Sequence, residues 1–230
     1  AKALLVSDKL FTKISKETVA NFNIVIRTKN LSVISQKVEA EGSITIPKPE
    51  DLAVIIYTSG TTSTPKGVML THYNLASQIN LLYNLYPIGP EDSMLSVLPM
   101  SHTYECSLGM LYVIATGAST TYLEKPPTPS VLLPALRRVR PTCFLIVPLI
   151  IEKVFNSQIL AKFTANKFMA TLYDVGFIRR FLHRLAGKKL IAAFGGRARL
   201  FIGGSKLDET VEQFLMDAKM PYAIGYGLTE

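Results

Sequence analysis

The sequence predicts an α/β fold built of mainly parallel sheets flanked by helices. The first observation is that apolar runs rich in β-branched residues alternate with amphipathic segments, as in repeated βα units. The second is the composition, because 230 residues that are 48% hydrophobic and 18% charged can form one large core or two closely packed subdomains. This composition also excludes a disordered chain.

Several segments are predicted as strands, because each is a short apolar or β-branched run between turn-forming residues. These segments are 3–6, 23–27, 53–58, 94–98, 120–123, 142–147, 200–203 and 222–225. The stretch 43–50 contains two prolines and is the best candidate for a linker.

Helical periodicity and capping residues predict the elements between these strands. The predicted helices cover 75–86, 108–115 with a stop at Gly117, a segment that starts at Thr128 and Pro129, and 208 to about 218. Strands and helices therefore alternate along most of the chain, which is the order expected for helices packed on a parallel sheet.

The cysteines and histidines argue against a disulfide scaffold or a metal centre. Cys106 and Cys143 are too few for the usual four-ligand zinc site, and their apolar surroundings favour core positions. The longest apolar run, 143–151, contains Pro148 and is far shorter than the roughly 20 residues of a spanning helix. We therefore expect no transmembrane segment and a reducing, cytoplasmic location. Because the chain starts at Ala1 without a leader and stops after a Gly-rich motif, we also expect it to be part of a longer protein.

The net charge of +8 is concentrated in one segment. No acidic residue occurs between Asp174 and Asp208, and this interval holds the basic residues Arg179, Arg180, Arg184, Lys188, Lys189, Arg197, Arg199 and Lys206. Such a segment can bind the phosphates of a nucleotide or contact an anionic membrane, or it can simply be a solvated face. A nucleic-acid partner is not expected, because the interleaved aromatic residues of a strand-binding surface are missing.

Part of this basic segment, 177–185, is predicted to be an amphipathic helix. One face would carry Phe177, Ile178, Phe181, Leu182 and Leu185, and the other Arg179, Arg180, His183 and Arg184. Two interpretations stay open. The preferred one is that the apolar face packs on the protein's own core, and the other is that the 177–199 segment contacts a membrane surface peripherally.

The segment 57–67, Tyr-Thr-Ser-Gly-Thr-Thr-Ser-Thr-Pro-Lys-Gly, directly follows the apolar run 52–56. It offers backbone N–H groups, hydroxyl donors and one cation at the end of a strand, which together suit a polyphosphate. It is not a Walker A loop, because Pro65 precedes Lys66 and Gly67 follows it. A surface turn could have this composition, but the density of such residues after a buried strand favours a phosphate loop.

Three motifs, in this order, resemble the adenylate-forming superfamily, which includes acyl-CoA synthetases and adenylation domains. They are 58–67, Pro99-Met-Ser-His102-Thr-Tyr-Glu105, and Gly225-Tyr226-Gly-Leu-Thr229-Glu230. The sequence between them, including 147–155 and 195–205, is most similar to long-chain fatty-acid CoA ligases. The resemblance implies that 1–230 is a partial N-terminal AMP-binding domain of the acyl-CoA synthetase fold, without the C-terminal domain.

The resemblance also implies an ATP site. It places the β and γ phosphates against Thr58, Ser59, Gly60, Thr61, Thr62 and Lys66. The family usually has Gly at the position of Ser63, and a serine held at positive φ would cost on the order of 1 kcal/mol. Thr229 would contact the α phosphate, Glu230 would hold Mg²⁺, and Tyr226 would stack on adenine unless it packs in the core.

The remaining site residues are assigned in the same way. Gly203, Gly204 and Ser205 would line the adenine and acyl pocket, although a plain strand-to-helix turn uses the same residues. His102 would lie near the acyl carboxylate in a positioning role and not as a general base. Without the resemblance, a single histidine at a helix start is more often a cap or a packing residue.

The implied activity is ATP-dependent conversion of a long-chain fatty acid to an acyl adenylate and then to acyl-CoA. ATP, Mg²⁺ and CoA take part, and Lys66, Thr229 and Glu230 are the expected catalytic residues. The 230-residue chain alone is expected to be inactive. The alternatives are a peptide-synthetase-like or aryl-acid adenylation domain, and a non-catalytic nucleotide-binding or membrane-associating module.

Overall fold

A computed structural model describes residues 2–37, 46–58 and 65–230. The chain divides into two compact units, 1–46 and 47–230. The division lies inside the stretch 43–50 that the sequence offers as a linker, of which 43–45 lie outside the described residues.

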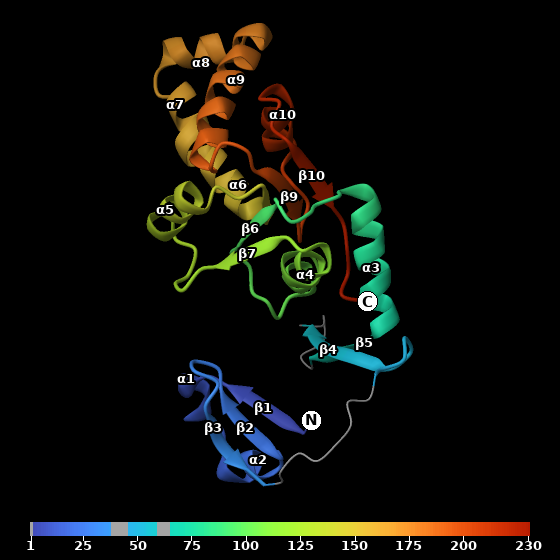
Figure 1. Cartoon of the computed structure of the whole chain (residues 1–230). Coiled ribbons are helices and arrows are strands. Elements are labelled where there is room, and N and C mark those ends of the chain that lie inside the picture. Colours follow the sequence, from blue (N-terminus) through green and yellow to red (C-terminus); the bar gives the residue numbers. More distant parts are fainter. Residues whose placement is uncertain (1, 38–45, 59–64) are drawn as a thin grey trace. The chain divides into compact units, whose positions relative to one another are not determined.

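The first unit is a small three-stranded sheet with two short helices (Figure 1). Strand β1 (Ala3–Val6) pairs in parallel with β2 (Ile24–Arg27), and β3 (Val33–Gln36) pairs antiparallel with β2. Helices α1 (Asp8–Phe11) and α2 (Lys16–Ala20) connect β1 to β2. The sequence predicts β1 and β2 but not β3, whose four residues are largely exposed and give no apolar run.

The second unit contains a five-stranded, fully parallel sheet. Its strands are β6 (Ser93–Ser96), β7 (Ser119–Tyr122), β8 (Cys143–Ile146), β9 (Arg199–Gly203) and β10 (Tyr222–Gly225). They lie in the order β10-β9-β8-β6-β7. The predicted α/β fold with a parallel sheet is therefore confirmed.

Helices connect the strands of this unit. They are α3 (His72–Leu85), η1 (Glu105–Leu111, a π-helix), α4 (Tyr112–Thr116), α5 (Pro129–Val139), α6 (Pro148–Val154), η2 (Phe155–Leu160, a π-helix), α7 (Ala161–Phe163), α8 (Lys167–Asp174), α9 (Gly176–Ala193) and α10 (Glu209–Asp217). Among them, α6, η2, α7 and α8 were not predicted. Thr128 and Asp208 are the N-caps of α5 and α10, and Gly117 ends α4 with φ 73°. Among the described helices, none is long and apolar enough to cross a membrane.

The core lies on both faces of the parallel sheet, and β8 shows this most clearly. Phe144 and Ile146 belong to a cluster with residues of α5, α6 and α10, whereas Cys143 and Leu145 pack with residues of η1, α4 and α3. In Figure 1, α5 and α6 accordingly lie on one side of the sheet, and α3 and α4 on the other. Burial on both faces is characteristic of parallel sheets and explains why β8 is apolar throughout.

A separate antiparallel hairpin precedes this sheet. Strand β4 (Leu52–Thr58) pairs with β5 (Lys66–Thr71). The sequence predicts β4 but interprets 66–67 as part of a loop, and this is corrected here because Lys66 and Gly67 already pair with Thr58 and Tyr57.

The orientation of α9 also corrects an expectation. The predicted helix exists, but its inward face carries His183, Gly187 and Leu190, whereas Phe177 is 76% exposed and Phe181 60% exposed. His183 was expected on the polar face. Gly187 allows close contact with α10, because a Cβ atom there would lie 2.5 Å from the Cβ of Ala218. Packing on this inward face turns Phe177 and Phe181 outward, so the preferred core-packing interpretation is wrong for these two residues in the described structure.

Candidate active site

The carboxyl edge of the parallel sheet brings two of the three sequence motifs together. Strand β6 leads into the segment with His102, β9 ends at Gly203, and β10 ends at Gly225. Gly203 and Gly225 are direct partners in the β9–β10 register. In open α/β sheets, ligands bind at this edge, so the motifs lie where the topology favours a site.

Tyr104 links these segments, although it was not among the predicted site residues. Its hydroxyl donates a hydrogen bond to the backbone oxygen of Phe201 at 2.8 Å, which ties η1 to β9. A Cβ atom at Gly203 would lie 3.2 Å from Cζ of Tyr104 and 3.3 Å from the backbone oxygen of Gly225. The glycine is therefore needed for the close approach of three segments. The only sequence signal for Tyr104 is its place inside the second motif.

His102 forms the turn that leads into η1. Its Nδ1 accepts a hydrogen bond from the backbone N–H of Tyr104 at 3.2 Å, and its own N–H donates to the backbone oxygen of Pro99 at 2.9 Å. The side chain is exposed at the sheet edge. This is the capping geometry that a histidine at a helix start often adopts. A contact with a substrate carboxylate stays a prediction.

Glu105 is a buried carboxyl group that the sequence analysis does not single out. It is fully buried, and neither of its oxygens has a hydrogen-bond partner of normal geometry among the described residues. Burial raises the pKa of this carboxyl group, and the neighbouring Ser96 hydroxyl and Leu98 N–H offset the effect only in part. Gly109, one turn along η1, makes room for it, since a Cβ there would lie 2.4 Å from Oε1. A π-helix often marks a functional site.

The turn after β9 is open to a ligand. Gly204 has φ 99°, which a residue with a side chain adopts only with strain, and a Cβ atom there would come no closer than 3.6 Å to another described segment, at Cγ1 of Val147. Gly204 and Ser205 are exposed, whereas Gly203 is buried. The backbone of this turn is therefore open to close approach, and its contact with a nucleotide or acyl group stays a prediction.

The segment after β10 carries three predicted site residues. Tyr226 is 92% exposed, so the alternative that its ring packs in the core does not hold in the described structure. Thr229 is half-buried and Glu230 is exposed. No group of three His, Cys, Asp or Glu side chains within the described ranges could hold a metal alone. A single exposed carboxylate still suits Mg²⁺, which is commonly held by one or two carboxylates together with substrate phosphates.

The phosphate loop is described only at its base. Thr58 and Lys66 are opposite each other in the β4–β5 register, so the first hydroxyl and the cation of the motif flank the loop. Ser59, Gly60, Thr61 and Thr62, and also Ser63, lie outside the described residues. Strand β5 contacts α3, but among the described residues no hydrogen bond or ion pair joins Lys66 to the sheet edge, so the described structure does not bring all three motifs together.

The comparison with known protein families settles the membership of the chain. Residues 1–230 match the family described as AMP-binding enzyme. The chain belongs to the AMP-binding enzyme family. Among curated relatives, this AMP-binding chain is 34% identical to long-chain-fatty-acid–CoA ligase 4 of Saccharomyces cerevisiae over 86% of its own length, and 32% identical to human long-chain-fatty-acid–CoA ligase 1 over 80%.

Solved structures agree on the fold of the AMP-binding chain. A long-chain-fatty-acid-CoA ligase (FadD1) from Archaeoglobus fulgidus matches with a TM-score of 0.67 at 19% identity, covering 100% of this chain and 43% of that one. ATP-bound MatB from Rhodopseudomonas palustris matches with a TM-score of 0.67 at 20% identity, covering 100% and 40%. The chain spans only 30% of the yeast relative and 28% of the human one.

Proposed function

We propose that this chain is part of an acid–thiol ligase that activates a fatty acid with ATP and transfers it to CoA. The observation that supports this most is the meeting of the His102 segment, the Gly203 turn and the Gly225 segment at one carboxyl edge, in a chain of the AMP-binding family. The long acyl chain is proposed from the two fatty-acid ligase relatives.

Each site residue has a role in the proposed reaction. Thr58, Lys66 and the loop residues Ser59, Gly60, Thr61 and Thr62 would hold the β and γ phosphates. Tyr226 would stack on adenine beside Gly203, Gly204 and Ser205, and Thr229 would donate to the α phosphate. His102 would position the acyl carboxylate. Glu230 would supply an oxygen ligand to Mg²⁺, which neutralises phosphate charge when it is bound.

The two chemical steps need little proton transfer from the protein. An oxygen of the fatty carboxylate attacks the α phosphorus, and the bond to the bridging oxygen breaks as pyrophosphate leaves. The CoA thiol then loses its proton to water, its sulfur attacks the acyl carbon, and the bond from that carbon to the phosphate oxygen breaks as AMP leaves with the bonding pair. Because a carboxylate is already a nucleophile, positioning and charge stabilisation account for the first step, and these are the functions that Lys66, Thr229 and the glycine turn can provide.

The location of the protein is proposed to be cytoplasmic, with CoA, ATP and fatty acid as its small-molecule partners. A peptide-synthetase-like or aryl-acid adenylation domain would use the same nucleotide residues. Acid-dependent exchange of pyrophosphate into ATP, measured with fatty, aryl and amino acids in parallel, separates these classes.

The test of the site assignment is Lys66→Ala in the natural full-length protein. We expect the rate of acid-dependent ATP/pyrophosphate exchange to fall by about 100-fold or more, because a cation on the departing charge is lost. Lys48→Ala is the matched control, since Lys48 is also exposed and precedes β4, at the end of the hairpin opposite to Thr58 and Lys66. Unchanged exchange in Lys66→Ala with an intact fold would refute the assignment.

A further inference from the structure

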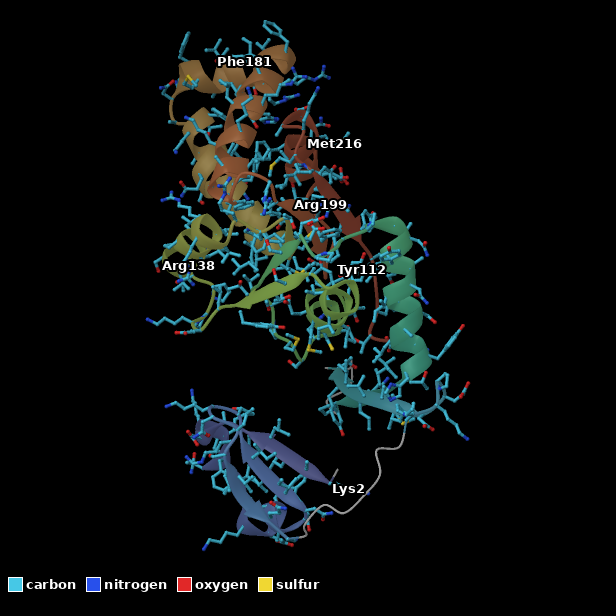
Figure 2. All side chains as sticks on the ribbon, in the orientation of Figure 1. Lys2, Tyr112, Arg138, Phe181, Arg199 and Met216 are labelled. Carbon is cyan, nitrogen blue, oxygen red and sulfur yellow. The ribbon has the colours of Figure 1, made fainter. Side chains whose placement is uncertain are left out.

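The outer end of the hairpin formed by α8 and α9 carries a set of exposed apolar side chains. These are Phe168 at 71% exposure, Val175 at 38%, Phe177 at 76%, Phe181 at 60% and Leu185 at 45%. Figure 2 shows Phe181 near the far end of this hairpin, away from the parallel sheet. Scattered single apolar residues need no explanation, but aromatic side chains gathered on one hairpin indicate a contact surface.

Three of these residues form a stripe on α9. Phe177, Phe181 and Leu185 follow one another at intervals of four, so they share one face of the helix. The buried residues His183 and Gly187 lie on the opposite face. The apolar stripe therefore points away from the core of this unit.

A row of basic side chains runs beside the apolar stripe. Arg180, Arg184 and Lys188 repeat at the same interval, three residues after each member of the stripe, and Lys189 lies at its other border. All four are exposed. Two acidic residues lie close by: Asp174, exposed at the end of α8, and Asp217 on α10, which pairs with Arg180 at 3.9 Å and is also engaged by His183. Among the described residues, no ion pair involves Arg184, Lys188 or Lys189. The surface around the stripe is therefore positively charged.

The helix that presents this surface is firmly held. His183 Nδ1 lies 2.9 Å from Oδ2 of Asp217 on α10, and its Nε2 lies 2.7 Å from the hydroxyl of Tyr173 on α8. Gly187 packs against Ala218 at the end of α10. The outward position of the aromatic stripe thus follows from specific contacts on the inward face.

We propose that the α8–α9 surface, defined as Phe177, Phe181 and Leu185 with Arg184, Lys188 and Lys189, docks on an anionic lipid bilayer. Aromatic and aliphatic side chains enter the boundary between headgroups and acyl chains, and the flanking cations pair with anionic headgroups. A helix with an apolar stripe bordered by Lys and Arg, and without acidic residues on that side, fits such a surface better than a neutral protein partner. The inference goes beyond the proposed reaction and does not depend on it.

The test is flotation of the natural full-length protein with phosphatidylcholine vesicles, prepared with and without phosphatidylglycerol. We expect binding only with phosphatidylglycerol, and loss of binding as salt is raised. The variant Arg184→Glu/Lys188→Glu/Lys189→Glu should bind at least about 100-fold more weakly, since each basic residue near an anionic surface contributes about a fivefold factor. Phe177→Ser/Phe181→Ser should also lose binding.

Two matched controls separate this surface from general effects of charge and exposure. Lys125→Glu/Arg137→Glu/Arg138→Glu reverses the same number of exposed charges around α5, and Tyr83→Ser/Ile114→Ser removes exposed apolar side chains from α3 and α4. Both controls should bind vesicles like the parent protein. Because every substituted side chain is exposed, circular dichroism should show folded protein for all four variants.

A tryptophan reporter tests the geometry of docking. The chain contains no tryptophan, so Phe181→Trp places the one tryptophan of this chain on the stripe. Its emission should shift to shorter wavelength when anionic vesicles are added and stay unchanged with neutral vesicles. The proposal is overturned if flotation is absent, if the controls lose binding as much as the surface variants do, or if Phe181→Trp already emits as a buried residue without vesicles because another part of the protein covers it.

Discussion

At the scale of single residues, Glu105 differs from an exposed carboxylate in its burial and in its pKa. Its side chain is fully buried on η1, and burial raises its pKa above the ordinary 4.5. The folded protein therefore binds this proton more tightly than the unfolded chain does. The stabilisation that results is complete below pH 4.5 and is lost as pH rises through the folded pKa.

This linkage gives a prediction for Glu105→Gln, which replaces the protonated acid by a neutral group of similar shape. Relative to the parent, the free energy of unfolding of the variant should rise as pH increases from about 4.5, because the glutamine cannot ionise. Denaturant unfolding over a series of pH values measures this. Glu91→Gln, an exposed acid in the same unit, should show no such trend. A parallel pH dependence of Glu105→Gln and the parent would contradict the assignment.

His183 gives a second prediction, in which stability changes with pH in the opposite direction. Burial lowers its pKa below the ordinary 6.5, although the hydrogen bond to Asp217 opposes this. A neutral ring satisfies both partners when Nδ1–H donates to Asp217 and Nε2 accepts from the Tyr173 hydroxyl. Its contribution to stability is therefore present above about pH 6.5 and is lost as pH falls through the lowered pKa.

The variant Tyr173→Phe tests this group without removing the ring that stacks on Phe163. It should lower the free energy of unfolding by roughly 1–3 kcal/mol, because Nε2 of a buried histidine loses its donor. The effect should be largest at neutral pH and smaller in acid, where the parent has itself lost part of the stabilisation. Chemical denaturation at about pH 5 and pH 7.5 compares the two conditions. An equal loss at both pH values would show that His183 does not titrate in this window.

At the scale of elements, the contact between α9 and α10 depends on one glycine. Gly187→Ala places a Cβ 2.5 Å from Cβ of Ala218 and 3.3 Å from its backbone. We expect a loss of about 1–3 kcal/mol in stability from this overlap, partly reduced by the higher helix propensity of alanine. Gly176→Ala is the control at the start of the same helix, where nothing lies within 4 Å, and it should be neutral or stabilising. Thermal unfolding of the two variants gives the comparison.

The elements that the sequence predicts well are those with local signals. Strands β1 and β10 match their predicted bounds, and Thr128 and Asp208 cap the helices that they were expected to start. These features depend on apolar runs and cap chemistry, which are visible in a few neighbouring residues.

What could not be predicted depends on distant partners. Strand β5 exists because Lys66 and its neighbours pair with β4, and the short motif alone indicates only a loop. Gly187 and His183 determine which face of α9 lies inward, because they contact residues of α10 and its C-terminal end that follow more than twenty residues later in the sequence. The most apolar side chains of α9 do not determine it. In the site, the motifs identify Gly203 and Tyr226, but the contact between Tyr104 and β9 and the unpaired state of Glu105 appear only when the strands are assembled.

At the scale of the whole molecule, the chain corresponds to only part of the length of its ligase relatives. It covers 30% of the yeast relative and 28% of the human one. We expect the purified 230-residue chain to bind MgATP weakly and to form no measurable CoA thioester, whereas the natural full-length protein turns over. Acid-dependent ATP/pyrophosphate exchange and thioester formation measured on both proteins check this. Comparable turnover by the short chain would show that these residues are sufficient.

The position of β10 in the strand order has a consequence for motion. β8 has neighbours on both sides, whereas β10 pairs only with β9 within the described sheet and leads directly to Tyr226 and Glu230. An edge strand opens locally at a lower cost than a central one. The amide hydrogens of Tyr222 to Gly225 should therefore exchange with solvent before those of β8, and a bound nucleotide that engages the following segment should slow their exchange while leaving β8 unchanged. The amide exchange rates of this one strand would then report whether a nucleotide is bound.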